Sequence, residues 1–305
     1  TAEDNLKVIL TWNSSGMSPP PAVNAIDESV KRRLFDPPGP LPAFEERGAK
    51  EADGARTTDI QLAMNGEKVP AFLVEPLEGG RHPAVLALHP APGDRSFFLK
   101  EARELARSGV VSLLIDAPWA DVQAWGRDLM EPGPGRETVV STAMGLRRVL
   151  DFLERRGNVN SSRMGFLGMS LGAMLGSILA GADRRISAFV LMSGLASFTD
   201  VAAVNIPVLK GEALERYRDI MAPVDPVNFL GEASPAQLFI QYGRRDVFPA
   251  EALERFAGAG SQPKTVTVYD ASHFLNEEAR SDGVDWLIER LGSGPRVIEV
   301  EAPSK

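Results

Sequence analysis

Short apolar segments and helix-like segments alternate along most of this chain, and the alternation limits the folds that it can adopt. PAVLALH, VVSLLIDAP and RMGFLG are largely apolar, and each is followed by a stretch with helical periodicity. A strand without a polar face must be buried on both sides, as in a parallel sheet covered by helices. The sequence therefore predicts an α/β fold with a mostly parallel sheet and helices on both faces.

An antiparallel hairpin is predicted ahead of the alternating region. TTDIQLAM and KVPAFLVEP show strand-like alternation and are joined by Asn65-Gly66, a dipeptide typical of two-residue hairpin turns. The predicted sheet is therefore mixed, with its antiparallel part near the start of the chain.

The chain divides by composition into three parts. Residues 1–56 contain the proline-rich stretches SSGMSPPP and DPPGPLPAFEERG, and we interpret them as an N-terminal arm that packs on the body or on a partner subunit. Residues 57–292 carry the alternating pattern, and residues 293–305 form a C-terminal tail. Two long connections, at 117–135 and 195–233, are expected to form a cap of loops. The arm makes a homodimer one of the expected assemblies.

The composition excludes several classes of protein. A net charge of −8 over 305 residues argues against non-specific nucleic-acid binding, and no apolar run has the roughly 18 residues of a membrane span. The absence of cysteine removes disulfides and thiolate chemistry, and the three histidines show no metal-ligand spacing, so neither a metal nor a cofactor is predicted. TAEDNLKVILTW has neither a basic start nor a cleavage site, which favours a cytoplasmic protein; a mature secreted or periplasmic form is the alternative.

A serine stands between two glycines where a predicted strand gives way to a helix. Ser170 lies in GFLGMSLGA, and Gly168 and Gly172 allow a tight turn because they lack β-carbons. Such a turn exposes the hydroxyl and directs the N–H of Leu171 into the same space. The alternative role for this serine is a helix N-cap.

Two further polar residues follow later strands, where ligands gather in sheets of this kind. Asp246 comes after LFIQYG, and His273 comes after TVTVYD. A serine hydroxyl needs an adjacent imidazole as base, and the imidazole needs a carboxylate that fixes its tautomer. The order serine, aspartate, histidine, each after a different strand, predicts a catalytic triad of Ser170, Asp246 and His273. Taken singly, Asp246 is better explained as a loop aspartate paired with Arg244 or Arg245, and the alternative for His273 is a structural histidine.

Other acidic residues fit the triad less well. Asp270 is three residues from His273, which is too close in the chain for it to lie behind the imidazole ring. Asp225 precedes a strand and is interpreted as a loop cap, and Asp116 ends a strand and is interpreted as organising the neighbouring loop.

The segments GFLGMSLGA, LFIQYGRRDVFP and VYDASHFL together resemble the α/β-hydrolase superfamily, in particular dienelactone hydrolases and bacterial serine esterases or acyl-peptidases. The resemblance covers residues 57–292 and implies one α/β-hydrolase catalytic domain there. Dienelactone hydrolases use a cysteine nucleophile, so Ser170 favours the esterase side. The resemblance implies that small-molecule carboxylic esters are hydrolysed through an acyl-enzyme.

The same resemblance implies an oxyanion hole. In the family, the loop after the strand PAVLALH begins with His-Gly and donates one N–H. His89 matches, but Pro90 replaces the glycine and has no N–H, so the N–H groups of Ala91 and Leu171 are the implied donors. We expect His89 to hold this loop through hydrogen bonds.

The overhanging connections supply the candidates for substrate binding. Trp119, Trp125, Met130 and Phe198 are predicted to line an acyl or leaving-group pocket, with packing of the loops as the alternative. Other functions stay open on this scaffold: an exopeptidase or amidase, a lactone or carbon–carbon bond hydrolase, and a non-catalytic protein that binds a small ligand.

Overall fold

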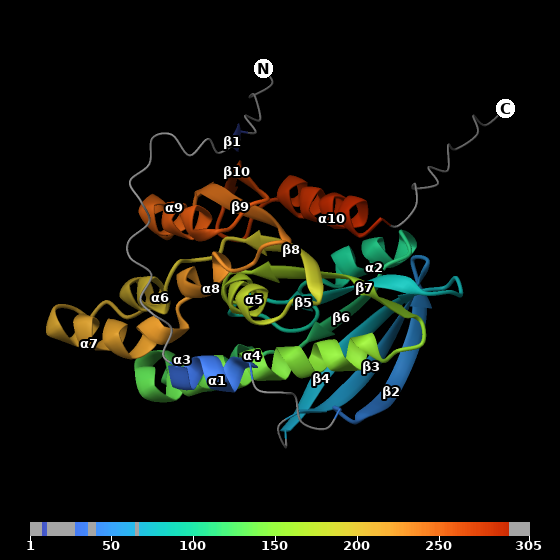
Figure 1. Cartoon of the computed structure of the whole chain (residues 1–305), viewed down its shortest axis with the longest axis horizontal. Helices are drawn as coiled ribbons and strands as arrows, with labels where there is room; N and C mark the ends of the chain where they lie inside the picture. Colours follow the sequence, from blue (N-terminus) through green and yellow to red (C-terminus); the bar gives the residue numbers. More distant parts are fainter. Residues whose placement is uncertain (1–7, 11–27, 36–40, 65–66, 293–305) are drawn as a thin grey trace.

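A computed structural model describes residues 8–10, 28–35, 41–64 and 67–292. They form a ten-stranded sheet with the strand order β1-β10-β9-β8-β7-β5-β6-β4-β3-β2 (Figure 1). The strands are β1 (Val8–Leu10), β2 (Phe44–Ala52), β3 (Ala55–Met64), β4 (Glu67–Pro76), β5 (His82–Leu88), β6 (Val111–Ile115), β7 (Val159–Met169), β8 (Ile186–Met192), β9 (Gln237–Arg245) and β10 (Lys264–Ser272).

The sheet is parallel in its centre and antiparallel at both edges. Strands β10, β9, β8, β7, β5 and β6 run parallel to one another, whereas β1 pairs antiparallel with β10, and β4, β3 and β2 continue antiparallel from β6. Met64 of β3 pairs with Glu67 of β4, as a two-residue hairpin requires. The predicted α/β fold with a mixed, mostly parallel sheet is confirmed.

Helices cover both faces of the sheet, as predicted. The helices are α1 (Glu28–Phe35), α2 (Leu99–Arg107), α3 (Val122–Met130), α4 (Pro132–Glu154), α5 (Leu171–Ala182), α6 (Phe198–Asn205), α7 (Glu212–Met221), α8 (Val227–Leu230), α9 (Ala250–Ala259) and α10 (Glu277–Leu291). Apolar residues of α2 and α10 form one core with the sheet, and those of α4, α5 and α9 form a second core on the other face. The strands between them are apolar on both sides because both faces are buried.

The sheet begins inside the segment predicted as an arm. Strand β2 covers residues 44–52, and β3 begins two residues before the predicted boundary at residue 57. All nine residues of β2 are exposed, so the strand has no apolar face that could have revealed it. Helix α1 packs on α4 and buries Val30 and Leu34. Strand β1 also lies in the predicted arm, whereas arm residues 1–7, 11–27 and 36–40 lie outside the described residues, as do the turn at 65–66 and the predicted tail at 293–305.

The two connections predicted as a cap of loops contain helices. The first holds a short 3₁₀ turn (Pro118–Ala120), α3 and the start of α4, and the second holds α6, α7 and α8. Asp121 accepts hydrogen bonds from the N–H groups of Gln123 and Ala124 and so caps the beginning of α3. Figure 1 shows α3, α6 and α7 gathered on the left of the sheet.

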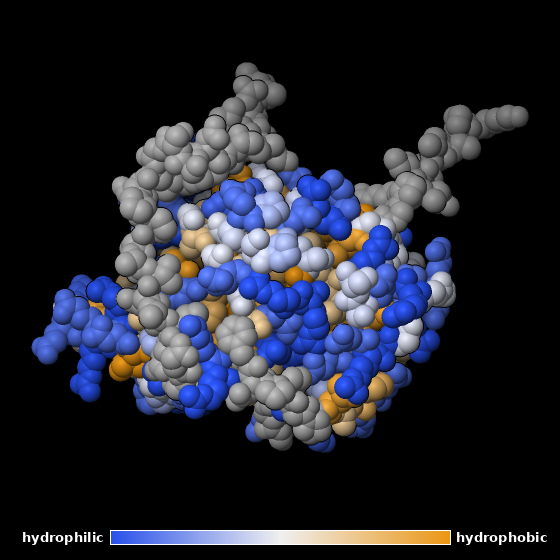
Figure 2. Space-filling view, in the orientation of Figure 1, coloured by the Kyte–Doolittle hydropathy of each residue, from blue (hydrophilic) through white to orange (hydrophobic). Residues whose placement is uncertain are grey.

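The face seen in Figure 2 is mostly hydrophilic, and its apolar residues occur in small separate groups. Within the described ranges, no helix combines the length and the apolar character that crossing a bilayer requires.

Candidate active site

Ser170 occupies a sharp turn between β7 and α5. Its backbone has φ 54° and ψ −117°, a conformation that side-chain-bearing residues rarely adopt and that is found mainly where the surrounding structure enforces it. The Ser170 N–H donates to the carbonyl of Met192 at the end of β8 (2.8 Å), which fixes the turn to the neighbouring strand. The Ser170 side chain makes no capping hydrogen bond to α5, so the predicted alternative of an N-cap does not describe it.

The two glycines beside Ser170 let backbone segments touch. A β-carbon on Gly172 would overlap the carbonyl oxygen of Leu88 at the end of β5, and one on Gly168 would lie 2.7 Å from the Gly172 carbonyl. Helix α5 can therefore begin directly against β5 and β7 only if both positions lack side chains. This packing brings the first turn of α5 beside the loop that follows β5.

The structure brings the three predicted triad residues into one hydrogen-bonded series. His273 Nε2 lies 2.9 Å from Ser170 Oγ, and His273 Nδ1 lies 2.9 Å and 3.0 Å from the two carboxylate oxygens of Asp246. Because a carboxylate accepts the Nδ1 proton, Nε2 is left as an acceptor for the serine hydroxyl. Ser170 and His273 are both buried, and the Asp246 side chain is 2% exposed.

The local structure after β9 aims the carboxylate. The N–H of Phe248 donates to Asp246 Oδ1 (3.0 Å), which folds the chain back two residues beyond the aspartate. The acids that the sequence analysis set aside have other partners. Asp270 pairs with Arg245, and Asp225 accepts the N–H of Phe198.

Two aromatic rings flank the imidazole, and the sequence patterns did not identify them. The ring centroids of Phe248 and Phe274 lie 5.1 Å and 5.6 Å from that of His273. Phe248 is buried, whereas Phe274 is 44% exposed. Each follows a triad residue within two positions in the sequence, and this proximity was the available signal.

His89 holds the loop after β5 by hydrogen bonds, as predicted. The N–H of Ala117 donates to His89 Nε2 (3.0 Å), so the proton is on Nδ1, which donates to the carbonyl of Pro90 (2.8 Å). Burial lowers the pKa of His89, and a neutral ring fits both hydrogen bonds. The indole N–H of Trp119 donates to the His89 carbonyl (3.1 Å), so the loops after β5 and β6 are tied together.

The N–H groups of Ala91 and Leu171 belong to the two segments that Gly172 brings together. Leu171 is the first residue of α5, and Ala91 lies in the loop held by His89. The start of a helix carries unpaired N–H groups and a positive partial charge, so this region favours a negatively charged oxygen.

The four candidates for substrate binding occupy different environments. Trp119 and Phe198 are fully buried in the core, which favours the packing alternative for these two side chains. Trp125 is partly buried, and its ring contacts that of Trp119 at a centroid distance of 6.0 Å. Met130 is exposed at the end of α3.

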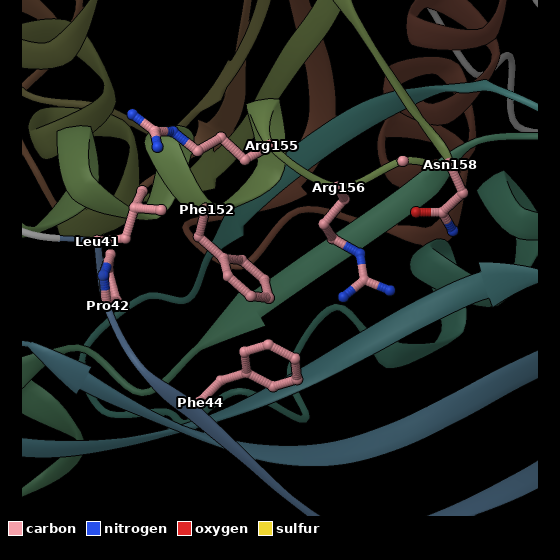
Figure 3. Close-up of a pocket in the computed structure, with 8 residues that line it drawn as sticks. Leu41, Pro42, Phe44, Phe152, Arg155, Arg156 and Asn158 are labelled. Carbon is pink, nitrogen blue, oxygen red and sulfur yellow. The ribbon is translucent and has the colours of Figure 1, made fainter.

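A cavity of about 380 Å³ lies at the β2 edge of the sheet, between the start of β2 and the end of α4 (Figure 3). The Phe44 and Phe152 rings meet edge-to-face there at 5.1 Å, and Arg156 pairs with Glu75 (2.7 Å). Asn158 of the lining immediately precedes β7, whereas Ser170 follows the end of that strand, so the cavity is separate from the triad.

Parts of this sequence are similar to known proteins. The family model for the C-terminal region of BAAT and acyl-CoA thioester hydrolases matches residues 147–223. An uncharacterized protein of Mycobacterium tuberculosis is 29% identical over 250 residues, which are 79% of this chain and 79% of that protein.

Two solved structures share the fold at low sequence identity. Acetyl xylan esterase 1 from Thermoanaerobacterium superimposes with a TM-score of 0.70 at 15% identity, covering 88% of this chain and 95% of that enzyme. A cold-adapted esterase from an Arctic intertidal metagenomic library superimposes with a TM-score of 0.61 at 21% identity, covering 82% of this chain and 99% of the esterase. The chain therefore shares the fold of these two esterases, as the motifs around Ser170, Asp246 and His273 predict.

Proposed function

We propose that this protein is a serine hydrolase that cleaves carboxylic esters of small molecules through an acyl-enzyme intermediate. The observation that carries the proposal is the series from Ser170 Oγ through the His273 imidazole to Asp246, with both links within 3.0 Å. The series is built on a strained turn at the beginning of a helix, where a nucleophile and an anion-stabilising helix start lie together.

Acylation begins with proton transfer from Ser170 to His273. As Ser170 Oγ forms a bond to the ester carbonyl carbon, its proton passes to His273 Nε2, and Asp246 stabilises the imidazolium. The carbonyl oxygen becomes an oxyanion, which accepts hydrogen bonds from the N–H groups of Leu171 and Ala91. Each such donor is worth about 3 kcal/mol in the transition state. His273 then gives its proton to the alcohol oxygen as the carbon–oxygen bond breaks.

Deacylation repeats these steps with water as the nucleophile. His273 Nε2 takes a proton from the water, the water oxygen attacks the acyl carbon, and the proton returns to Ser170 Oγ as the acid leaves. One of the two oxygens of the released carboxylic acid comes from water and the other is the ester's own carbonyl oxygen, and the enzyme returns to its starting state.

The test compares hydrolysis of p-nitrophenyl esters from acetate to dodecanoate by the wild type, Ser170→Ala and Ser177→Ala. Ser177 is a matched control, because it is a fully buried serine of the same helix whose hydroxyl donates to the Ala173 carbonyl. We expect Ser170→Ala to lower kcat by at least about 1,000-fold, because the triad acts as a unit. Ser177→Ala should stay within about twofold of the wild type, and the chain-length profile then measures the acyl site.

A fluorophosphonate probe separates the alternatives. Labelling of Ser170 without ester hydrolysis would favour an amidase, an exopeptidase or a lactone or carbon–carbon bond hydrolase. A wild type that is inert toward every ester and toward the probe contradicts the proposal and favours a non-catalytic binding protein.

Thioesters are a second candidate for the scissile bond, because the matched family model includes acyl-CoA thioester hydrolases. The same attack on a carbonyl carbon would release a thiol in place of an alcohol. Turnover of butyryl-CoA and p-nitrophenyl butyrate in the same assay compares the two with one acyl group. A higher kcat/KM for the thioester would assign the enzyme to thioesters.

A further inference from the structure

Ser193 lies fully buried at the end of β8 and contacts the backbone of His273. Its hydroxyl donates to the carbonyl of His273 (2.7 Å), and its N–H donates to the carbonyl of Gln241 in β9 (2.8 Å). Its backbone has φ 49°, in the left-handed region that favours glycine. A serine is present at this position although a glycine would adopt the same backbone with less strain.

A buried polar network supports this contact from the other side. Gln241 is fully buried, and its side-chain amide donates to the hydroxyl of Tyr269 (2.8 Å) and to the carbonyl of Ala279 in α10 (2.7 Å). The Tyr269 hydroxyl in turn donates to Asp282 (2.8 Å). Gln241, which accepts the Ser193 N–H, is therefore hydrogen-bonded to both β10 and α10. These are the elements that precede and follow His273 in the chain.

His273 itself lies outside regular structure. Strand β10 ends at Ser272, and the next turn is closed by a hydrogen bond from the N–H of Leu275 to the carbonyl of Ser272 (3.0 Å). Leu275 also has a positive φ, 56°. The hydrogen bond from the Ser193 hydroxyl connects this turn to the end of the central strand β8. Its acceptor is the backbone carbonyl of His273, the residue whose side chain must contact both Ser170 and Asp246.

We propose that Ser193 is a positioning residue for the reaction: its hydroxyl holds the His273 backbone so that the imidazole meets the nucleophile and the carboxylate together. This role rests on the proposed serine-hydrolase function. Reaction rates depend steeply on such alignment, since a displacement of about 1 Å can lower a rate about 100-fold. The strained backbone at Ser193 is consistent with a position where the hydroxyl is needed.

The experiment compares Ser193→Ala, Ser193→Gly and Ser193→Cys with the Ser177→Ala control. Alanine removes the hydroxyl and keeps the backbone strain, whereas glycine removes the hydroxyl and relieves the strain. Cysteine keeps a weaker donor of similar size. The measurements are kcat and KM for p-nitrophenyl acetate, the rate of fluorophosphonate labelling, and the thermal unfolding temperature of each variant.

We expect Ser193→Ala and Ser193→Gly to lower kcat and the labelling rate by about 10- to 100-fold, with KM changed by less than about threefold, because the substrate site itself is intact. Ser193→Cys should recover part of the loss. If Ser193→Ala and Ser193→Gly lose kcat equally although their unfolding temperatures differ, the loss comes from misalignment of His273 and not from reduced stability. Rates that match Ser177→Ala, or that follow only the folded fraction, would overturn the proposal.

A second measurement keeps the test independent of catalysis. The chain has three histidines, so the Nδ1 proton that His273 donates to Asp246 can be assigned by NMR with His89→Gln and His82→Gln variants. We expect Ser193→Ala to increase the exchange of this proton with water, and an unchanged proton would contradict the positioning role. A wild type that is inert toward esters and the probe would overturn the proposed function, while this signal still reports whether Ser193 holds His273.

Discussion

At the scale of single residues, the geometry of the site depends on close contacts between backbone segments. Gly172 is the clearest case, because its α-carbon packs on the carbonyl of Leu88 where a methyl group would overlap it. The contact fixes the N–H of Leu171 relative to the loop that carries Ala91. The spacing between the two implied oxyanion donors is therefore set by backbone packing, which leaves little freedom to adjust.

Gly172→Ala is expected to damage both stability and reactivity. Overpacking of this kind typically costs about 1–3 kcal/mol, and the helix start must move to make room. We expect a lower unfolding free energy in chemical denaturation and much slower fluorophosphonate labelling of Ser170. Gly126→Ala is the matched control, because Gly126 also lies in a helix but a methyl group there would meet no atom within 4 Å. That change should raise stability by about 0.5–1 kcal/mol and leave labelling unchanged; equal effects of the two changes would contradict this account.

The site could be predicted at the residue scale only in part. Ser170, Asp246 and His273 each follow an apolar strand, and their chemistry explains why they occur together. Ser193 shows no comparable signal, because its acceptor is the carbonyl of a residue 80 positions further along the chain. Hydrogen bonds to backbone atoms place no constraint on the type of the accepting residue, so the sequence carries no trace of them.

At the scale of elements, helix α1 is joined to α4 by apolar and polar contacts. Val30 and Leu34 are buried, Arg33 pairs with Glu137 (2.6 Å), and Arg147 donates to the carbonyl of Leu34. A cation at the C-terminal end of a helix satisfies carbonyls that lack a helical partner. We therefore propose that this part of the predicted arm is a docked element of the body.

Leu34→Ala is expected to loosen α1 without disturbing the triad. Truncation of a buried leucine lowers the free energy of unfolding by about 2–5 kcal/mol. We expect this loss to appear first as local opening of α1, the helix that carries Leu34. Hydrogen exchange should become faster for α1 amides while ester hydrolysis stays within about twofold of the wild type. Arg32→Ala, at an exposed position on the same helix, should change neither quantity. Loss of hydrolysis together with the loosening would instead show that α1 supports the active site.

The elements with strong apolar periodicity could be predicted from the sequence. The buried strands and the helices α2, α4, α5 and α10 follow the pattern in the sequence, whereas β2 and α3 do not. Strand β2 is exposed along its whole length and depends on pairing with β3, which periodicity does not report. For α3, the N-cap at Asp121 was a usable signal within a segment dominated by proline and glycine.

At the scale of the whole molecule, four neighbouring strands each supply one part of the site. Ser170 follows β7, Ser193 follows β8, Asp246 lies just beyond β9, and His273 follows β10, and these strands are adjacent in the sheet. The order of residues in the sequence predicts which strands are involved. That β8 and β9 lie side by side between β7 and β10 is known only from the structure, because the order of strands along the chain does not determine their order in the sheet.

The stability of the molecule is expected to depend on pH through Asp225. This carboxyl is 6% exposed and accepts the Phe198 N–H, and burial raises its pKa to about 8, with nearby Asp200 acting in the same direction and Arg218 and Arg255 opposing it. Below about pH 4 the group is protonated in both the folded and the unfolded state. Between about pH 4 and 8 the unfolded chain loses this proton first, so the contribution of Asp225 to stability falls as the pH rises.

Asp225→Asn should remove this pH dependence, because the amide oxygen can still accept the Phe198 N–H and carries no charge. The free energy of unfolding, from denaturant titrations at pH 4 to 9, should be similar for the two proteins near pH 4. By pH 8 the variant should be more stable by the order of a few kcal/mol. A difference that does not change with pH would contradict the raised pKa.

The pairing of β1 with β10 affects how the sheet can assemble during synthesis. Residues 8–10 are synthesised long before their pairing partners, residues 266–268. Synthesis proceeds from the N-terminus, so this edge strand stays unpaired while most of the sheet forms. His273 directly follows β10, which is the last of the described strands along the chain, so the arrival of β10 provides both the partner of β1 and the imidazole of the candidate active site.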